Sequence, residues 1–197
     1  GSIRDVSTLK NILEFLNQFE LKKVTFLLDK GFYSTENIVV MKRRRLQFIT
    51  PLPFSVQEAE KLIERHQEKI IDIANALRVS KQILYCVKDK ITVDKYSLNA
   101  YIYFDKRKRL EGEERLLERI MEAEEKVERR HFADKQAVQK YLLQHAAELK
   151  KFFGVRKAKG AFVLSRDTEE IEKAIKQMAY VIILSTRSMN PREIVLL

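Results

Sequence analysis

The sequence predicts a mixed α/β (α+β) fold in which a partly parallel sheet is interrupted by a largely helical insertion. Two short apolar runs, residues 24–28 and 46–50, flank a segment whose apolar residues have helical spacing, which is the layering of α/β proteins. A third apolar run, residues 180–185, indicates a strand near the other end of the chain. Between these parts, residues 111–130 and 134–153 are rich in helix-forming and charged residues.

In the first segment, either Asp5 or Ser7 can cap a helix whose apolar residues recur at helical spacing over residues 9–19. Residues 24–28 are apolar at every position but one, so we expect a strand that is buried on both faces. Asp29 follows this strand directly.

A second helix is expected over residues 35–44, with Ser34 as its N-cap. Residues 46–50 form the next predicted strand, and Pro51 and Pro53 end it. Helix and strand alternate at lengths that suit parallel pairing of the two strands.

Beyond Pro53 the elements are predicted from capping residues and periodicity. Residues 55–58 form a capping-box pattern, which opens a long charged helix that reaches Ile73. Asn190 and Pro191 suit the N-cap and first position of a short last helix. The remaining predictions are strands at 82–87, 97–104 and 160–164 and a helix at 168–179.

Composition narrows the class of protein. The 197 residues are 45% hydrophobic, which is enough for a real core, and they carry 38 basic against 28 acidic side chains, a net charge of +10. This excess favours polyanionic partners such as nucleic acid or an anionic membrane surface. Cys86 is the only cysteine, which excludes a disulfide framework and a cysteine-based zinc site and suits the cytoplasm. No stretch approaches the roughly 18–20 apolar residues of a membrane span, and no Gly-rich phosphate loop is present.

The charge is unevenly distributed along the chain. Residues 1–52 carry 9 basic and 5 acidic side chains, and residues 150–197 carry 10 and 5, whereas residues 53–149 carry 19 and 18. We therefore expect an insertion domain over residues 54–158, between residues 1–53 and residues 159–197, which together form one core. In that arrangement the strands at 24–28, 46–50 and 181–185 share one sheet.

Asp29 is the sharpest candidate for a functional residue. A carboxylate at the carboxyl end of a strand lies where open α/β sheets place their active sites. The alternative is that Asp29 only caps a helix or closes a turn. Spacing does not decide between these, because no second carboxylate pair is close in sequence.

Residues 29–37 and residues 48–53 resemble the region around the second catalytic aspartate of bacterial insertion-sequence transposases. These are DDE enzymes with an RNase H-like core that belong to the "insertion sequence four" group and its relatives. Residues 1–9 resemble the segment that precedes this region in the group. Residues 181–186 and 190–194 resemble the strand and helix start that lead to its third catalytic residue. The group often has Arg where this chain has Lys30.

The resemblance implies that Asp29 is the second catalytic aspartate and a ligand for divalent metal. It places the first aspartate before residue 1 and the glutamate after Leu197, so the chain is expected to be a fragment with a partial RNase H-like core. In the intact enzyme three carboxylates hold two Mg²⁺ ions for phosphodiester cleavage and strand transfer, with DNA as partner and a homodimer as the working form. The fragment alone is expected to bind no Mg²⁺ and to be inactive.

Lys30 and the run Arg43, Arg44 and Arg45 are the candidate DNA-binding residues. The run can clamp DNA phosphates near the active site, or it can simply complement the dipole at a solvated helix end. Tyr101, Tyr103 and Phe104 can stack on bases, but alternation along a strand favours positions on a sheet face. The alternatives for the whole chain are another RNase H-like nuclease, or a noncatalytic DNA-binding or interaction module from a decayed element.

Overall fold

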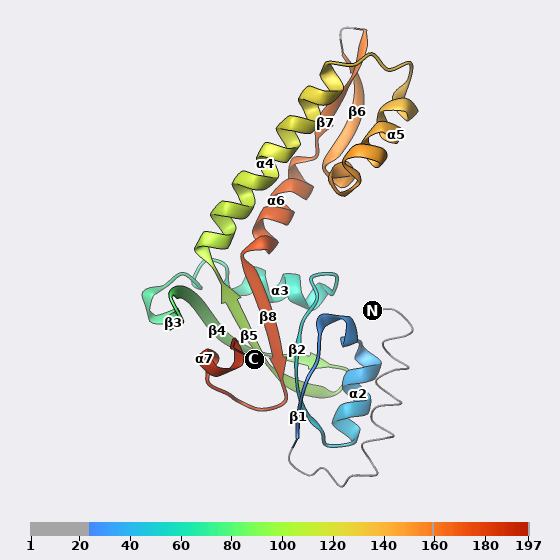
Figure 1. Cartoon of the computed structure of the whole chain (residues 1–197). Coiled ribbons are helices and arrows are strands. Elements are labelled where there is room, and N and C mark those ends of the chain that lie inside the picture. The colour runs from blue at the N-terminus through green and yellow to red at the C-terminus, as the bar shows by residue number, and fades with distance from the viewer. Residues whose placement is uncertain (1–23, 159, 197) are drawn as a thin grey trace. The chain divides into compact units, whose positions relative to one another are not determined.

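The computed structural model describes residues 24–158 and 160–196, which belong to two compact units (Figure 1). The sheet unit comprises Gly1–Asp105 and Tyr180–Leu197, and the inserted unit comprises Lys106–Ala179. The helix predicted over residues 9–19 lies outside the described residues. None of the described helices combines the length and the apolar character that crossing a bilayer requires.

The sheet unit is built on a six-stranded sheet of mixed direction, with strand order β1-β2-β8-β5-β4-β3. Its first two strands are parallel and every other neighbouring pair is antiparallel. The prediction that the runs at 24–28, 46–50 and 181–185 share one partly parallel sheet is therefore confirmed. The strands are β1 (Thr25–Leu27), β2 (Gln47–Pro51), β3 (Ala76–Val79), β4 (Gln82–Val93), β5 (Tyr96–Phe104) and β8 (Tyr180–Ser185).

Helix α2 (Thr35–Arg43) connects the two parallel strands. Its N-cap is Ser34, as predicted, and the Ser34 hydroxyl accepts a hydrogen bond of 3.1 Å from the backbone N–H of Asn37. Ile38 and Met41 lie three residues apart on the same side of the helix and are completely buried. The local capping chemistry and the apolar stripe together fix this crossover between β1 and β2.

Strand β1 differs from its prediction as a strand buried on both faces. It is an edge strand, with β2 as its only neighbour in the described sheet, and Leu27 is 54% exposed. Apolar residues on both faces are typical of central parallel strands, but the pattern alone carries no information about the number of neighbours.

The helix predicted from the capping box is also too long. Helix α3 (Gln57–His66) has Val56 as its N-cap with no side-chain hydrogen bond, so Ser55 does not cap it. The chain then turns, and Ile70 is completely buried beyond the helix end. Ile70 therefore continues the helical spacing of apolar residues in the sequence, although it lies beyond the end of the helix.

The boundaries of the insertion differ most from the sequence-based expectation of 54–158. Strands β3, β4 and β5 belong to the six-stranded sheet, and the inserted unit begins only after Asp105 and ends at Ala179. The two connections leave neighbouring strands, since Phe104 of β5 pairs with Tyr180 of β8. The nearly equal numbers of acidic and basic residues over 53–149 indicate a solvated segment. They do not show that the β4–β5 hairpin belongs to the sheet and only the later residues to the inserted unit.

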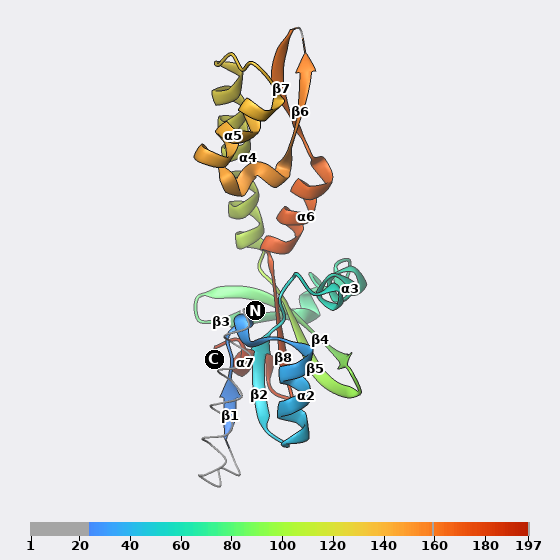
Figure 2. The same ribbon diagram turned by 90° about the vertical axis from the view of Figure 1, so that its right-hand side faces the viewer.

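The inserted unit consists of helices packed on a two-stranded hairpin (Figure 2). The hairpin strand β6 is absent from the sequence-based prediction, because residues 134–153 have the composition of one helix, whereas α5 ends at His145 and a 3-10 turn follows. Leu116, Ile120 and Phe152 share one apolar cluster, and Val127, Val138 and Leu142 share another. The elements are α4 (Lys106–Glu128), α5 (Lys135–His145), η4 (Ala147–Phe152), β6 (Phe153–Ala158), β7 (Ala161–Arg166) and α6 (Thr168–Met178).

Candidate functional site

Asp29 lies at the carboxyl end of β1, two residues after the last strand residue. It is the N-cap of the 3-10 helix η2 (Lys30–Phe32), and its Oδ1 accepts a 2.6 Å hydrogen bond from the Lys30 backbone N–H. The capping role expected as the alternative is therefore real. The residue is nevertheless exposed, and within the described part of the chain Oδ2 has no hydrogen-bond partner. One carboxylate oxygen thus remains available to a ligand.

A cavity of about 820 Å³ in the sheet unit is lined from Lys30 onward, and Asp29 itself is not one of its lining residues. It is lined by the residues that follow Asp29, by the end of β2 and the turn after it, and by the start of β8. Its polar groups include Lys30, Tyr33, Ser34 and Ser55. Burial, and secondarily the charge of Glu58, raises the pKa of Tyr33, so its hydroxyl stays protonated and can donate a hydrogen bond.

The short helix α7 (Pro191–Ile194) begins at the same level along the strands as Asp29. One row of paired residues crosses three strands: Pro51 of β2, Ile183 of β8 and Tyr101 of β5. Leu27 is paired with Ile49, so Asp29, two residues after Leu27, lies level with Pro51 and hence with this row. The lateral separation from Asp29 to Tyr101 is three strand spacings, or about 14 Å, and Ile194 of α7 packs further across the sheet, in one apolar cluster with Leu77 of β3 and Cys86 of β4.

Two tyrosines of β5 hold the chain that leads into α7. The Tyr101 hydroxyl accepts from the Met189 backbone N–H at 2.6 Å and lies 3.1 Å from the Met189 carbonyl oxygen. The Tyr103 hydroxyl donates to the Pro191 carbonyl oxygen at 2.7 Å. Asn190 caps α7 as predicted, since its side chain accepts from Arg192 N–H at 2.9 Å. The tyrosines thus lie on a sheet face and use their hydroxyls to position a helix start.

The structure separates the predicted DNA-binding residues into two groups. Lys30 lies beside Asp29, whereas Arg43, Arg44 and Arg45 lie at the far end of α2, just before β2 begins. Because β1 and β2 are parallel, these are opposite ends of the sheet, and nine helical residues span about 13 Å. The expectation that the arginines lie close to the candidate active site is therefore wrong. A short separation in sequence suggests proximity, but the crossover helix carries the chain away.

Asp29 fits a hard cation as a single ligand, because its exposed carboxylate oxygen is the kind of donor that Mg²⁺ prefers. Among residues 24–158 and 160–196, no group of three or more His, Cys, Asp or Glu side chains is placed to hold a metal ion. The other ligands that the resemblance implies have no counterpart in the described residues.

A His–Asp–Arg cluster in the sheet unit has no counterpart among the sequence-based predictions. Asp89 Oδ2 lies 2.6 Å from Arg65 Nη1 and 2.8 Å from His66 Nε2, and its Oδ1 accepts from the Lys90 backbone N–H at 2.7 Å. Burial alone raises the pKa of Asp89, but the hydrogen bonds from His66, Lys90 and Arg65 and the Arg65 charge outweigh it, so the net pKa is lowered. The cluster fastens α3 to β4. Asp89 is more than twenty positions from its two partners, so no local sequence signal marks the cluster.

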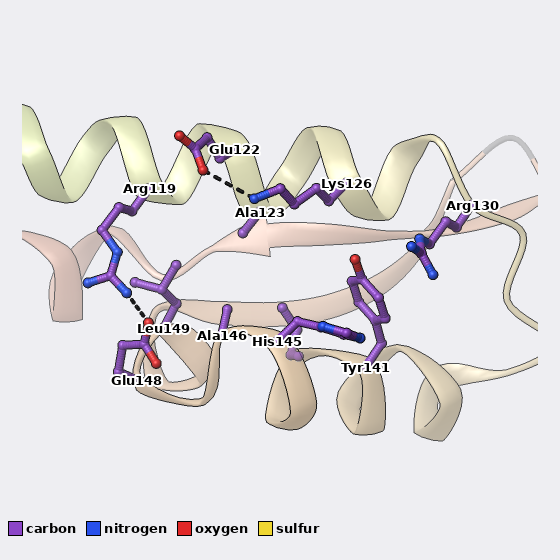
Figure 3. Close-up of a pocket in the computed structure, with 11 residues that line it drawn as sticks. Arg119, Glu122, Ala123, Lys126, Arg130, Tyr141, His145, Ala146, Glu148 and Leu149 are labelled. Carbon is purple, nitrogen blue, oxygen red and sulfur yellow. Dashed lines mark hydrogen bonds and ion pairs between the residues drawn. The ribbon is translucent and has the colours of Figure 1, made fainter.

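The inserted unit has its own cavity, of about 490 Å³, between α4, α5 and η4 (Figure 3). Ion pairs join Arg119 to Glu148 and Lys126 to Glu122 across or along its walls. The Arg130 guanidinium lies 4.6 Å from the ring centre of Tyr141. Because most of the charges in its walls are paired, the cavity offers few polar groups to a ligand.

No protein-family model, curated protein or solved structure matches the chain.

Proposed function

We propose that the chain is part of a DDE-type DNA transposase with an RNase H-like core, and that Asp29 supplies one of its three catalytic carboxylates. The observation that carries this proposal is the position of Asp29. Its exposed carboxylate stands at the carboxyl end of a parallel β1–α2–β2 unit, and the next residue, Lys30, lines a cavity of about 820 Å³. The sequence pattern over residues 29–37 resembles the transposase group, and this resemblance is the reason for assigning Asp29 as a metal-binding catalytic aspartate.

The start of α7 supports the same proposal. In the transposase group a strand followed by a helix start leads to the third carboxylate, and here Asn190 and Pro191 begin the short helix α7 after β8. Tyr101 and Tyr103 hold its first turn through backbone groups of Met189 and Pro191.

In the intact enzyme Asp29 would be a metal ligand, and the Oδ1 hydrogen bond from Lys30 N–H would hold its orientation. A bound pair of Mg²⁺ ions supplies charge stabilisation at the phosphate and activation of the attacking hydroxyl. Lys30 and the polar groups of the adjacent cavity would bind the phosphodiester backbone of the DNA strand near Asp29.

The test is a plasmid excision assay with the Asp29→Asn variant of the intact transposase. Excision should be abolished while DNA binding and folding persist, because the substitution removes a ligand charge and no packing group. Asp72→Asn is the matched control: Asp72 is also an exposed aspartate of the sheet unit that caps a 3-10 helix, η3 (Ile73–Asn75), through its side chain. Near-normal excision by Asp29→Asn would remove Asp29 from the active site.

A further inference from the structure

The structure gathers basic side chains from three separate segments at the end of the sheet remote from Asp29. Lys42 and Lys95 both lie within 6 Å of the Tyr96 ring centre, at 5.9 Å and 5.8 Å, so the end of α2 meets the β4–β5 turn there. After β8, the Arg187 Nη1 donates to Gln47 Oε1 at 2.9 Å, which brings Arg187 beside the start of β2. We call this surface the remote basic cluster, which consists of Lys42, Arg43, Arg44, Arg45, Lys95 and Arg187.

The charge of the remote basic cluster is not neutralised within the described part of the chain. None of its six cations forms an ion pair with a described residue, although Asp94 directly precedes Lys95 in the β4–β5 turn. This contrasts with the inserted unit, where Lys126 and Arg129 are each paired with a glutamate four residues earlier. A concentration of positive charge that no described acidic side chain pairs with attracts a polyanion.

Arg45 gives an independent sign that the cluster is more than a solvated helix end. Helix α2 ends in a Schellman motif, in which Leu46 N–H bonds to the Met41 carbonyl and Arg45 N–H to the Lys42 carbonyl, both at 3.0 Å. Arg45 has a φ of 57°, the left-handed conformation that this motif normally gives to glycine. A long cationic side chain thus occupies a position where glycine would carry no backbone strain.

We propose that the remote basic cluster binds the phosphate backbone of duplex nucleic acid, independently of its sequence and away from the scissile phosphate at Asp29. The surface offers guanidinium groups, which match phosphate geometry, and residues 42–47, 94–97 and 186–188 include no exposed large hydrophobic side chain that would anchor a lipid surface. The proposal rests on the proposed function only for the choice of nucleic acid as partner, and its readout requires no catalysis.

The first test is titration of a labelled random-sequence duplex with the 197-residue chain at several salt concentrations. The variant Arg43→Gln, Arg44→Gln, Arg45→Gln should bind more weakly and lower the salt slope by roughly one unit for each phosphate that the variant no longer binds. The matched control removes three exposed lysines elsewhere on the sheet unit, Lys61→Gln, Lys69→Gln, Lys81→Gln, with the same change in net charge. Equal losses in both variants would show diffuse attraction to net charge and would overturn the proposal.

Arg45→Gly separates binding from structure within a single substitution. Glycine adopts a φ of 57° without strain, so the variant should melt at a higher temperature than the parent and yet bind the duplex several-fold more weakly. Higher stability with unchanged affinity would overturn the role of Arg45. Binding to phosphatidylserine vesicles without binding to the duplex would overturn the choice of partner. The titration requires no catalytic residue, so failure of the catalytic proposal would not affect this result.

Discussion

Single residues in this chain are best predicted where their partners are close in sequence. Ser34 and Asn190 cap their helices as their sequence patterns indicate, because the donors lie two or three residues away. Asp29 can also be identified, but the sequence leaves two roles open, and the structure shows the capping one directly. The contacts of Asp89 with Arg65 and His66 have no such local signal, because the fold brings the partners together across more than twenty residues.

The lowered pKa of Asp89 predicts an acid-sensitive contribution to stability. A carboxyl whose pKa is lower in the folded than in the unfolded chain stabilises the fold above its unfolded pKa, about 3.9. That contribution is lost as the pH falls through the still lower folded pKa. Asp89→Asn should therefore cost about 1–2 kcal/mol in the free energy of unfolding at pH 7, and less at pH 3.

Urea unfolding at pH 7 and pH 3 measures this difference. Asp94→Asn serves as the control, because Asp94 is exposed in a turn at a φ of 54°, which asparagine also adopts. If Asp89→Asn lowered the free energy of unfolding equally at both pH values, the charge of Asp89 would contribute nothing to stability.

At the scale of elements, the periodicity of apolar residues predicts whether a segment is a helix or a strand better than it predicts which elements the segment packs against. Strand β1 is located correctly but lies at the sheet edge, since an apolar run does not reveal how many neighbours the strand has. Strand β6 is missed because residues 153–158 follow a segment whose helical composition continues past the end of α5. The position of α7 depends on hydroxyl contacts from β5, which no local pattern encodes.

Those contacts predict that Tyr101 and Tyr103 order the segment before α7. Tyr101→Phe removes the acceptor of the Met189 N–H, and Tyr103→Phe leaves the Pro191 carbonyl without its donor. Each should lower the free energy of unfolding by about 1 kcal/mol, with faster amide exchange at Met189 for Tyr101→Phe.

Hydrogen exchange followed by NMR distinguishes this local effect from general loosening. The exchange rates of the β8 amides should differ from those of the parent only by the amount that the change in global stability accounts for. Tyr96→Phe is the control, because the Tyr96 ring contacts Lys42 and Lys95 but its hydroxyl has no hydrogen bond within the described residues. Unchanged Met189 exchange in Tyr101→Phe would contradict the anchoring role.

At the scale of the whole molecule, the sequence predicts two parts joined twice but misplaces the joints. Balanced charge assigns the hairpin β4–β5 to the insertion, yet Tyr101 and Ile102 are nearly fully buried in the central sheet. Burial of that kind depends on the neighbouring strand β8, which comes more than seventy residues later.

The observed joints predict that the inserted unit can be removed without unfolding the sheet unit. Since Phe104 and Tyr180 are paired on neighbouring antiparallel strands, an Asn-Gly turn placed after Asp105 should replace residues 106–179 as a hairpin connection. The shortened chain should retain a cooperative thermal transition and dispersed NMR amide signals. A chain without residues 54–158 should not fold, because it lacks β3, β4 and β5. If the chain lacking residues 106–179 were unfolded, the division into two units would be contradicted.

The most direct test of the central claim is a change of metal preference at Asp29. In the intact transposase, Asp29→Cys replaces a hard oxygen ligand with a softer sulfur ligand, which Mg²⁺ accepts poorly. We predict that plasmid excision by this variant is lost with Mg²⁺ and partly restored with Mn²⁺, while Asp72→Cys behaves like the parent with both ions. Excision by Asp29→Cys at the parental level with Mg²⁺ would contradict the assignment of Asp29 as a metal ligand.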